Sequence, residues 1–243
     1  MSLAPALVLF QFAAAAVSPP VSYPFGVGER FDYTAKFGML SVGTASIQVA
    51  EIDTVRGQPA FLFRFSLDGS ALVFRIQSSL ESWTSVQGFR SLRFRQDSKE
   101  NSRRYLREYE IFGDSGYYRQ KEATATTPTS AEPLDDASFL YFVRTTPLEV
   151  GKSYKFERHF KPELNPILIN VLKRETIELP DGTKVPSLVL NPVVGDKMFA
   201  ERAEARLWIT DDARRIPVQI RSRLPYGTIT LRLEKITPAP GGS

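Results

Sequence analysis

The sequence has no cysteine and only one histidine, His159. Without cysteine the chain can form no disulfide, has no thiolate nucleophile or cysteine-based zinc site, and offers no lipidation site for a lipoprotein anchor. A single imidazole is also the most that histidine can contribute to acid–base chemistry. We therefore expect no metal site, no cofactor and no lipoprotein.

Common catalytic and nucleotide-binding motifs are missing too. The sequence contains no G-x-S-x-G, no P-loop, no G-x-G-x-x-G and no H-E-x-x-H. Its charge is nearly balanced, with 31 Lys and Arg against 27 Asp and Glu, which permits an anionic partner without requiring one. The basic stretches lack the interleaved aromatics of a nucleic-acid surface, so we expect no nucleic-acid partner.

Long apolar runs are confined to the N-terminus. The first eighteen residues are apolar, uncharged and end in small residues, as in a secretory signal with cleavage after Ala16 or Ser18. The basic residues that usually precede such a run are absent. A membrane-anchoring helix is the alternative, which Pro5, Gln11 and a length below the roughly 20 residues of a span disfavour. We expect residues 1–18 to be a signal peptide and the protein to be periplasmic, soluble or peripheral after cleavage.

The strongest pattern present is the alternation of apolar and polar residues. Three consecutive runs show it, at 203–210, 216–224 and 228–234, joined by short turns. A period of two places alternate side chains on opposite faces of a strand, so these runs predict an antiparallel meander with one face on a core. With 42% hydrophobic and 12% aromatic residues, the chain can fill that core.

Similar runs occur along the rest of the chain, and we expect strands at 28–37, 42–50, 60–67, 72–83, 88–96, 103–112, 152–160, 167–179 and 185–192. After a polar loop, one helix is expected, capped by Asp135 or Asp136 and ended by Pro147. The predicted fold is all-β and mainly antiparallel: a curved sheet closing into a barrel-like or half-barrel fold, with one short helix packed on it or plugging it. We expect a lead-in at 19–27, a single domain at 28–237 and a disordered tail at 238–243.

An aromatic stripe is the first candidate site. Phe61, Phe63 and Phe65 alternate along one predicted strand, and the predicted helix adds Phe139 and Phe142. Such a set usually belongs to a core, but small barrels also use one to line a ligand cavity. Two interpretations stand: these side chains fill the interior, or they line a cavity for an apolar ligand.

An arginine-rich strand pair is the second candidate. It carries Arg93, Arg95, Arg103 and Arg107, with two further arginines between 88 and 112. A solvated outer face that discourages edge pairing explains such a cluster structurally. An arginine side chain can donate two parallel hydrogen bonds to one phosphate or carboxylate group. The functional interpretation is therefore a docking surface for lipid or an envelope polymer.

A few single residues could carry chemistry. His159 lies among charged neighbours on a predicted strand, and we expect a structural role rather than that of a general base. Adjacent Asp211 and Asp212 favour an Asx-type turn over an acid–base or metal pair. Trp83 and Trp208 could stack on a sugar ring, although packing is the default for such side chains. We assign no catalytic residue.

Several stretches match a known family in order and spacing. They are Gly28-Glu-Arg-Phe-Asp-Tyr33 with Val42-Gly-Thr-Ala45, Asp136-Ala-Ser-Phe-Leu-Tyr-Phe-Val-Arg144 with Leu148-Glu-Val-Gly151, Arg174-Glu-Thr-Ile-Glu-Leu-Pro-Asp-Gly182, and Leu207-Trp-Ile-Thr-Asp-Asp-Ala-Arg-Arg-Ile-Pro217 with Gly227. The chain resembles the bacterial family called domain of unknown function 3108, over nearly all of 28–236. The resemblance implies an exported envelope protein with an antiparallel, barrel-like fold. It brings no catalytic residues, because the family has no established activity.

Together these features predict a non-enzymatic protein of the cell envelope. It would hold an apolar, lipid-like ligand or act as an envelope assembly or scaffold module, with lipid, envelope polymer or other envelope proteins as partners. One alternative is a hydrolase or transferase acting on envelope glycan or lipid, which requires Asp211, Asp212 or His159 to converge in one cleft. Another is a protein-interaction module, which requires an exposed apolar patch or an open sheet edge.

Overall fold

Fourteen strands pair into one antiparallel sheet in the computed structural model, which describes residues 22–71, 74–195, 199–224 and 227–241. The predicted signal segment at 1–18 lies outside these residues. The first strands are β1 (Arg30–Phe37), β2 (Leu40–Val55), β3 (Gln58–Ala71), β4 (Phe74–Ser85), β5 (Ser91–Glu100), β6 (Arg103–Phe112), β7 (Tyr117–Gln120) and β8 (Thr127–Pro128). The others are β9 (Ser153–Phe156), β10 (Ile167–Glu178), β11 (Lys184–Val193), β12 (Arg206–Thr210), β13 (Pro217–Leu224) and β14 (Gly227–Thr237).

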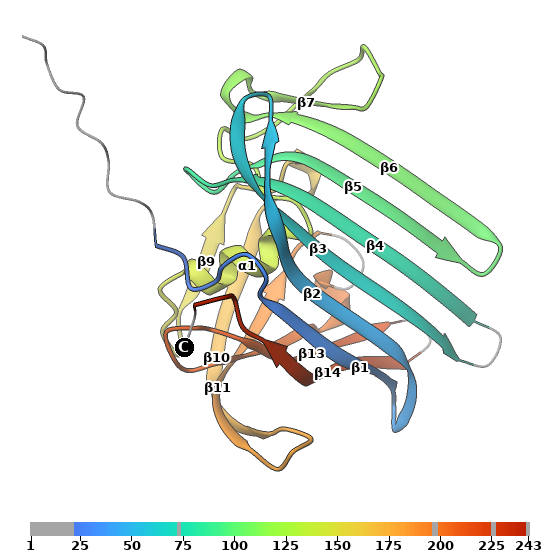
Figure 1. Ribbon diagram of the computed structural model, residues 1–243, viewed down its shortest axis with the longest axis vertical. Helices are drawn as coiled ribbons and strands as arrows, with labels where there is room; N and C mark the ends of the chain where they lie inside the picture. Colours follow the sequence, from blue (N-terminus) through green and yellow to red (C-terminus); the bar gives the residue numbers. More distant parts are fainter. Residues whose placement is uncertain (1–21, 72–73, 196–198, 225–226, 242–243) are drawn as a thin grey trace, which may run out of the picture.

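The sheet consists of two meanders joined by the terminal strands. Strands β1 to β8 pair in sequence order, and so do β9 to β14. β1 then pairs antiparallel with β14, with Phe31 opposite Ile236 and Ala35 opposite Leu231. The strands nearest the two ends of the described chain thus form the middle of the sheet (Figure 1). The predicted fold class is confirmed: the sheet is antiparallel and curled without closing.

Three local predictions differ from the structure. The strand expected at 152–160 is shorter, because β9 ends at Phe156. Residues 203–205 were expected to begin a strand, but η4 (Glu201–Ala203) is a short 3-10 helix and Glu204 has a φ of 45°. This left-handed backbone turns Glu204 toward solvent, between two buried alanines. In the sequence, the order apolar–polar–apolar is the same as that of a strand, although the backbone here is not extended. β7 and β8 were not predicted because strands of four and two residues are too short to show a period of two.

One α-helix, α1 (Ser138–Thr145), lies in the described residues and connects the two meanders. Its residues from Ser138 to Arg144 are all buried. The Asp135 carboxylate accepts the N–H groups of Ala137 and Ser138 at 3.0 and 2.9 Å, so the predicted cap is confirmed at Asp135. The helix lies inside the curl, between the two meanders (Figure 1).

The strands approach closely at Gly43, which lies opposite Gly69 on β3. A Cβ atom at Gly43 would lie 2.0 Å from the Asp68 carbonyl oxygen. Only glycine allows this contact.

Candidate functional site

The aromatic stripe faces an interior that the chain itself fills. Phe61 and Phe63 stack with their centroids 5.6 Å apart, and the Tyr141 ring of α1 stacks on Phe63 at 3.9 Å. Phe25, from the predicted lead-in, contacts Phe63 at 5.6 Å and Tyr141 at 5.0 Å. Tyr23 packs edge-on against Phe61 at 5.4 Å. The lead-in therefore takes part in the core and occupies the space in front of the stripe.

The other predicted cavity residues belong to the same buried cluster. Phe65 is 9% exposed, and Phe139 and Phe142 are 2% and 8% exposed. The Phe139 ring lies 5.7 Å from Phe199, and the Phe142 ring lies 5.0 Å from Phe156 of β9. The structure thus brings all five phenylalanines into one core, where the chain's own rings pack against them.

A buried ion pair, not found from the sequence, fixes the end of α1. Two N–H groups of Arg144 donate to the Glu29 carboxylate at 2.5 and 3.0 Å, and others donate to the carbonyl oxygens of Pro24 and Arg214. The guanidinium also lies 5.3 Å from the Phe25 ring centroid. Both charged residues occur in the family-like stretches, but only the fold shows that they pair.

A buried carboxyl group fixes the other end of the helix. Asp135 is fully buried; Ser82 on β4 donates to it at 2.6 Å, and its backbone N–H donates to the Ser138 hydroxyl. Burial raises the pKa of Asp135 to about 6, against hydrogen bonds that lower it. With both helix ends bonded to strands, the polar interior serves to anchor α1.

The residues weighed for catalysis do not share a site. His159 is 1% exposed; its Nδ1 accepts the N–H of Lys161, and its Nε2 lies 3.4 Å from Asp136. Asp211 instead pairs with Arg174 at 2.6 Å. Asp212 accepts the N–H groups of residues 214 and 215, which confirms the predicted Asx-type turn. Each residue has partners of its own, and the cleft that the enzyme alternative required is not formed by them.

Both tryptophans are held by polar and charged neighbours. Trp83 donates to Asp53 at 2.8 Å, and the Arg93 guanidinium lies 5.4 Å from its ring centroid. Trp208 is 5% exposed and has Arg221 over its ring at 5.4 Å. Trp83 also packs against the buried cluster of Val55, Ala60 and Leu92, so both indoles are used in packing.

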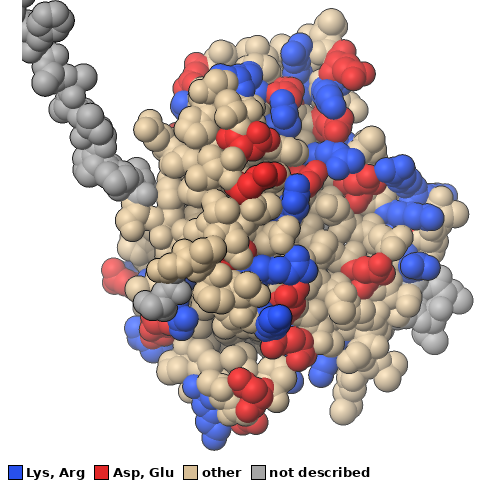
Figure 2. Space-filling view, in the orientation of Figure 1, with Lys and Arg blue, Asp and Glu red and all other residues tan. Residues whose placement is uncertain are grey.

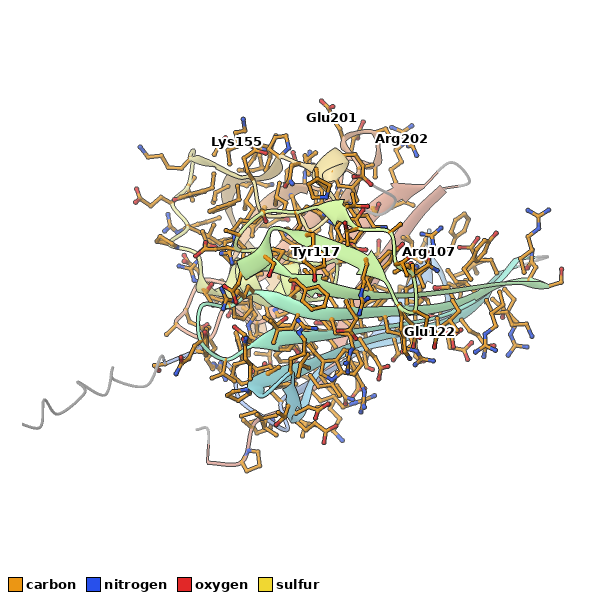
Figure 3. All side chains as sticks on the ribbon, turned by 90° about the horizontal axis from the view of Figure 1, so that it is seen from above. Arg107, Tyr117, Glu122, Lys155, Glu201 and Arg202 are labelled. Atoms are coloured by element: carbon orange, nitrogen blue, oxygen red, sulfur yellow. The ribbon has the colours of Figure 1, made fainter. Side chains whose placement is uncertain are left out.

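The predicted arginine cluster is divided between the two faces of the sheet. In the β5–β6 hairpin, Gln96 lies directly opposite Arg107, and both share the inner face with buried Phe94. The outer face carries Arg93 and Arg95, and the inner face carries Arg103 and Arg107. In Figure 3, Arg107 lies on the strands of the first meander, apart from Glu201 and Arg202 of the second.

A turn signal in the sequence could have predicted this division. Asn101 and Ser102 form a two-residue hairpin turn, with Asn101 at a φ of 53° and Glu100 opposite Arg103. Such a turn pairs odd positions of one strand with even positions of the next. Odd-numbered arginines on the two strands must therefore face opposite ways.

On the outer face, charges of alternating sign form a ladder across the four strands β3 to β6, which ends at Lys121 just after β7. Arg64 bonds to Glu81 at 2.9 Å, and Glu81 bonds to Arg95 at 3.1 Å. Arg95 and Lys121 both pair with Glu108, at 3.2 and 3.0 Å. Figure 2 shows basic and acidic side chains interleaved over this side of the molecule. The outer arginines are thus already matched by carboxylates, as in a solvated structural face.

A polar groove of about 700 Å³ lies beside this ladder, on the outer face of β2 to β6. Gln77 donates to Asp68 at 2.9 Å, and Arg104 donates to Asp97 at 2.9 and 2.6 Å. Hydroxyl groups of Thr44 and other residues line the rest. Unlike the filled interior, this groove is open to solvent and is lined mainly by polar and charged residues.

No group of three or more His, Asp or Glu side chains among the described residues could hold a metal ion. In the same part of the chain, no helix is both long and apolar enough to cross a membrane.

Comparison with known proteins places the chain by family and by fold. The family described as "Protein of unknown function (DUF3108)" matches residues 32–234. No curated protein matches. Among solved structures, the chain is similar to a beta-barrel-like protein of domain of unknown function DUF1849 from Brucella abortus, with 9% identity and a TM-score of 0.52. That match covers 88% of this chain and 98% of the other, and at this identity it shows the fold alone.

Proposed function

The chain belongs to the DUF3108 family, and we propose that it is a non-enzymatic cell-envelope protein that acts as an assembly or scaffold module through its surface. The observation that carries this proposal is the filled interior. Tyr141 stacks on Phe63 at 3.9 Å, and Phe63 is completely buried. Pockets for drug-sized ligands span about 300 Å³ or more, and ring stacking of this kind leaves no such space at the stripe.

The arrangement of polar groups also favours a non-enzymatic role over the alternative of a hydrolase or transferase acting on the envelope. His159, Asp211 and Asp212 have separate partners. Asp135, whose pKa is raised, is enclosed by the helix and β4 rather than facing a cleft. The raised pKa of Asp135 is therefore explained by its structural role in holding the helix, and it does not mark a catalytic group.

The location in the envelope rests on the signal-like residues 1–18. Fractionation of cells that express the full chain tests it, and recovery in the cytosol would contradict it.

Native mass spectrometry of the mature protein, purified gently from its own envelope, tests the interior. We expect the mass of the polypeptide alone and no lipid after organic extraction. Phe63→Ala should lower the free energy of unfolding by about 3–5 kcal/mol, because it opens a cavity in a packed core. Leu40→Ala, at a side chain that is 70% exposed, is the control. A stoichiometric apolar molecule that is bound by the wild type and lost in Phe63→Ala would overturn the proposal.

A further inference from the structure

One end of the first meander combines free positive charge with exposed apolar side chains. The β1/β2 turn at 38–39, the paired ends of β3 and β4 at Ala71 and Phe74, and the β5/β6 turn at 101–102 lie at this end, which we name the hairpin end. It projects from the body of the molecule (Figure 1 and Figure 3). We propose that the hairpin end docks on the surface of an anionic phospholipid bilayer. The inference rests on the proposed function, since it names the partner of a surface-acting envelope protein.

The apolar component is concentrated at two strand tips. Met39 and Leu40, at the β1/β2 turn, are 97% and 70% exposed. Leu106 and Tyr105 on β6 are 49% and 37% exposed. These are four of the nine large apolar side chains that are exposed among the described residues, which sets this end apart from scattered surface apolar residues.

The basic component differs from the outer-face ladder because its cations have no partners. The side chains of Arg75, Lys99, Arg103 and Arg107 make no ion pair or hydrogen bond with any described residue. Unpaired cations can meet lipid phosphates without first breaking an internal ion pair.

A hollow between two of these cations has the donors that a phosphate group requires. It measures about 390 Å³ and is lined by Arg75, Gln77, Lys99 and Asn101, with no carboxylate. Gln77 lies directly opposite Lys99, and the Asn101 side-chain oxygen accepts the N–H of Arg75, which leaves its amide N–H groups available. Carboxylates lie in the adjoining groove, where Asp68 accepts a hydrogen bond from Gln77 and Asp97 accepts two from Arg104.

The two components together favour a membrane over a soluble anion. A soluble polyanion would engage the cations and leave Met39 and Leu40 in water. A bilayer interface takes both, with apolar and aromatic side chains at the acyl boundary and cations at the phosphates. Apolar tips beside a donor-lined hollow therefore fit anionic phospholipid.

Flotation of the mature protein with phosphatidylcholine vesicles, with and without phosphatidylglycerol, tests the proposal. We expect the protein to float only with the anionic vesicles and to be released by salt. The double variant Arg75→Gln/Lys99→Gln should lose about 30-fold in vesicle binding. Met39→Ser/Leu40→Ser should also lose binding. Circular dichroism and thermal melting check that each variant is folded, which exposed positions should permit.

Lys152→Gln/Lys184→Gln provides the matched control, because both lysines are exposed, lie outside the hairpin end and change the net charge equally. Equal loss in this control, or no flotation of the wild type, would overturn the proposal. Unchanged binding in Met39→Ser/Leu40→Ser would indicate a polyanion site and overturn it as well. If the wild type purifies from the envelope without a ligand and does not bind vesicles, the bilayer proposal is contradicted and the proposed scaffold function still stands.

Discussion

The two ends of the first meander have similar side chains but use them differently. At the loop end, formed by the turns at 56–57, 87–90 and 113–116, Arg56 and Arg93 both pair with Glu110, and Arg90 pairs with Asp114. At the hairpin end, Arg103 lies opposite Glu100 without an ion pair. Arginine content alone therefore says little about function. What differs between the two ends is whether the arginine is actually paired with a carboxylate in the folded sheet.

The buried charges follow the same division. Asp135 bonds to Ser82, close to the loop end of β4, and Glu29 immediately precedes β1. These groups anchor the helix, whereas the hairpin end has exposed and unpaired side chains. We expect substitutions near the loop end to change stability and substitutions at the hairpin end to change binding.

The largest expected effect is at the buried ion pair. Glu29→Leu should lower the free energy of unfolding by about 3–5 kcal/mol, because it leaves the Arg144 guanidinium buried without its carboxylate. Urea denaturation measures the change. Glu29→Leu/Arg144→Leu should recover part of the loss, since no charge is then left unpaired. The hairpin-end control is Glu100→Leu, with an effect below about 0.5 kcal/mol. A double variant that loses the sum of both single changes would contradict this account.

The next effect depends on pH and comes from Asp135. Its pKa is raised from 3.8 to about 6 in the folded state, so the folded protein binds a proton more tightly than the unfolded chain does. The resulting stabilisation is fully present below about pH 4 and is lost as the pH rises through about 6, by an amount on the order of 3 kcal/mol.

Asp135→Asn, which keeps an acceptor for the helix N–H groups, should abolish this difference. The measurement is the free energy of unfolding of wild type and variant at several pH values from 4 to 8, taken as a difference so that other carboxylates cancel. Parallel curves for the two proteins would show that Asp135 does not titrate in this range.

The smallest effect compares exposed charges at the two ends. Glu110→Gln should cost about 1 kcal/mol because it weakens two partly exposed ion pairs at the loop end, whereas Arg103→Gln should change stability by close to zero. Thermal melting at low and high salt measures both. A larger loss from Arg103→Gln would mean that the hairpin end is also bound into the fold.

Much of the architecture could be predicted from local patterns. Alternation identified most strands, the run of Phe61, Phe63 and Phe65 identified a core face, and the cap at Asp135 and the turn at Asp212 were predicted from residue type. Each of these features depends on residues a few positions apart, where backbone geometry links spacing directly to direction.

Tertiary structure alone decided the long-range relations. The pairing of β1 with β14, the contact of Glu29 with Arg144 and the entry of Phe25 into the core join positions far apart in the chain. Whether the aromatic stripe lined a cavity depended on which segment came to lie in front of it, and the strand pattern carries no information on that. Sequence patterning thus determined which side of each strand is apolar, while packing determined what each apolar side and each charge would meet.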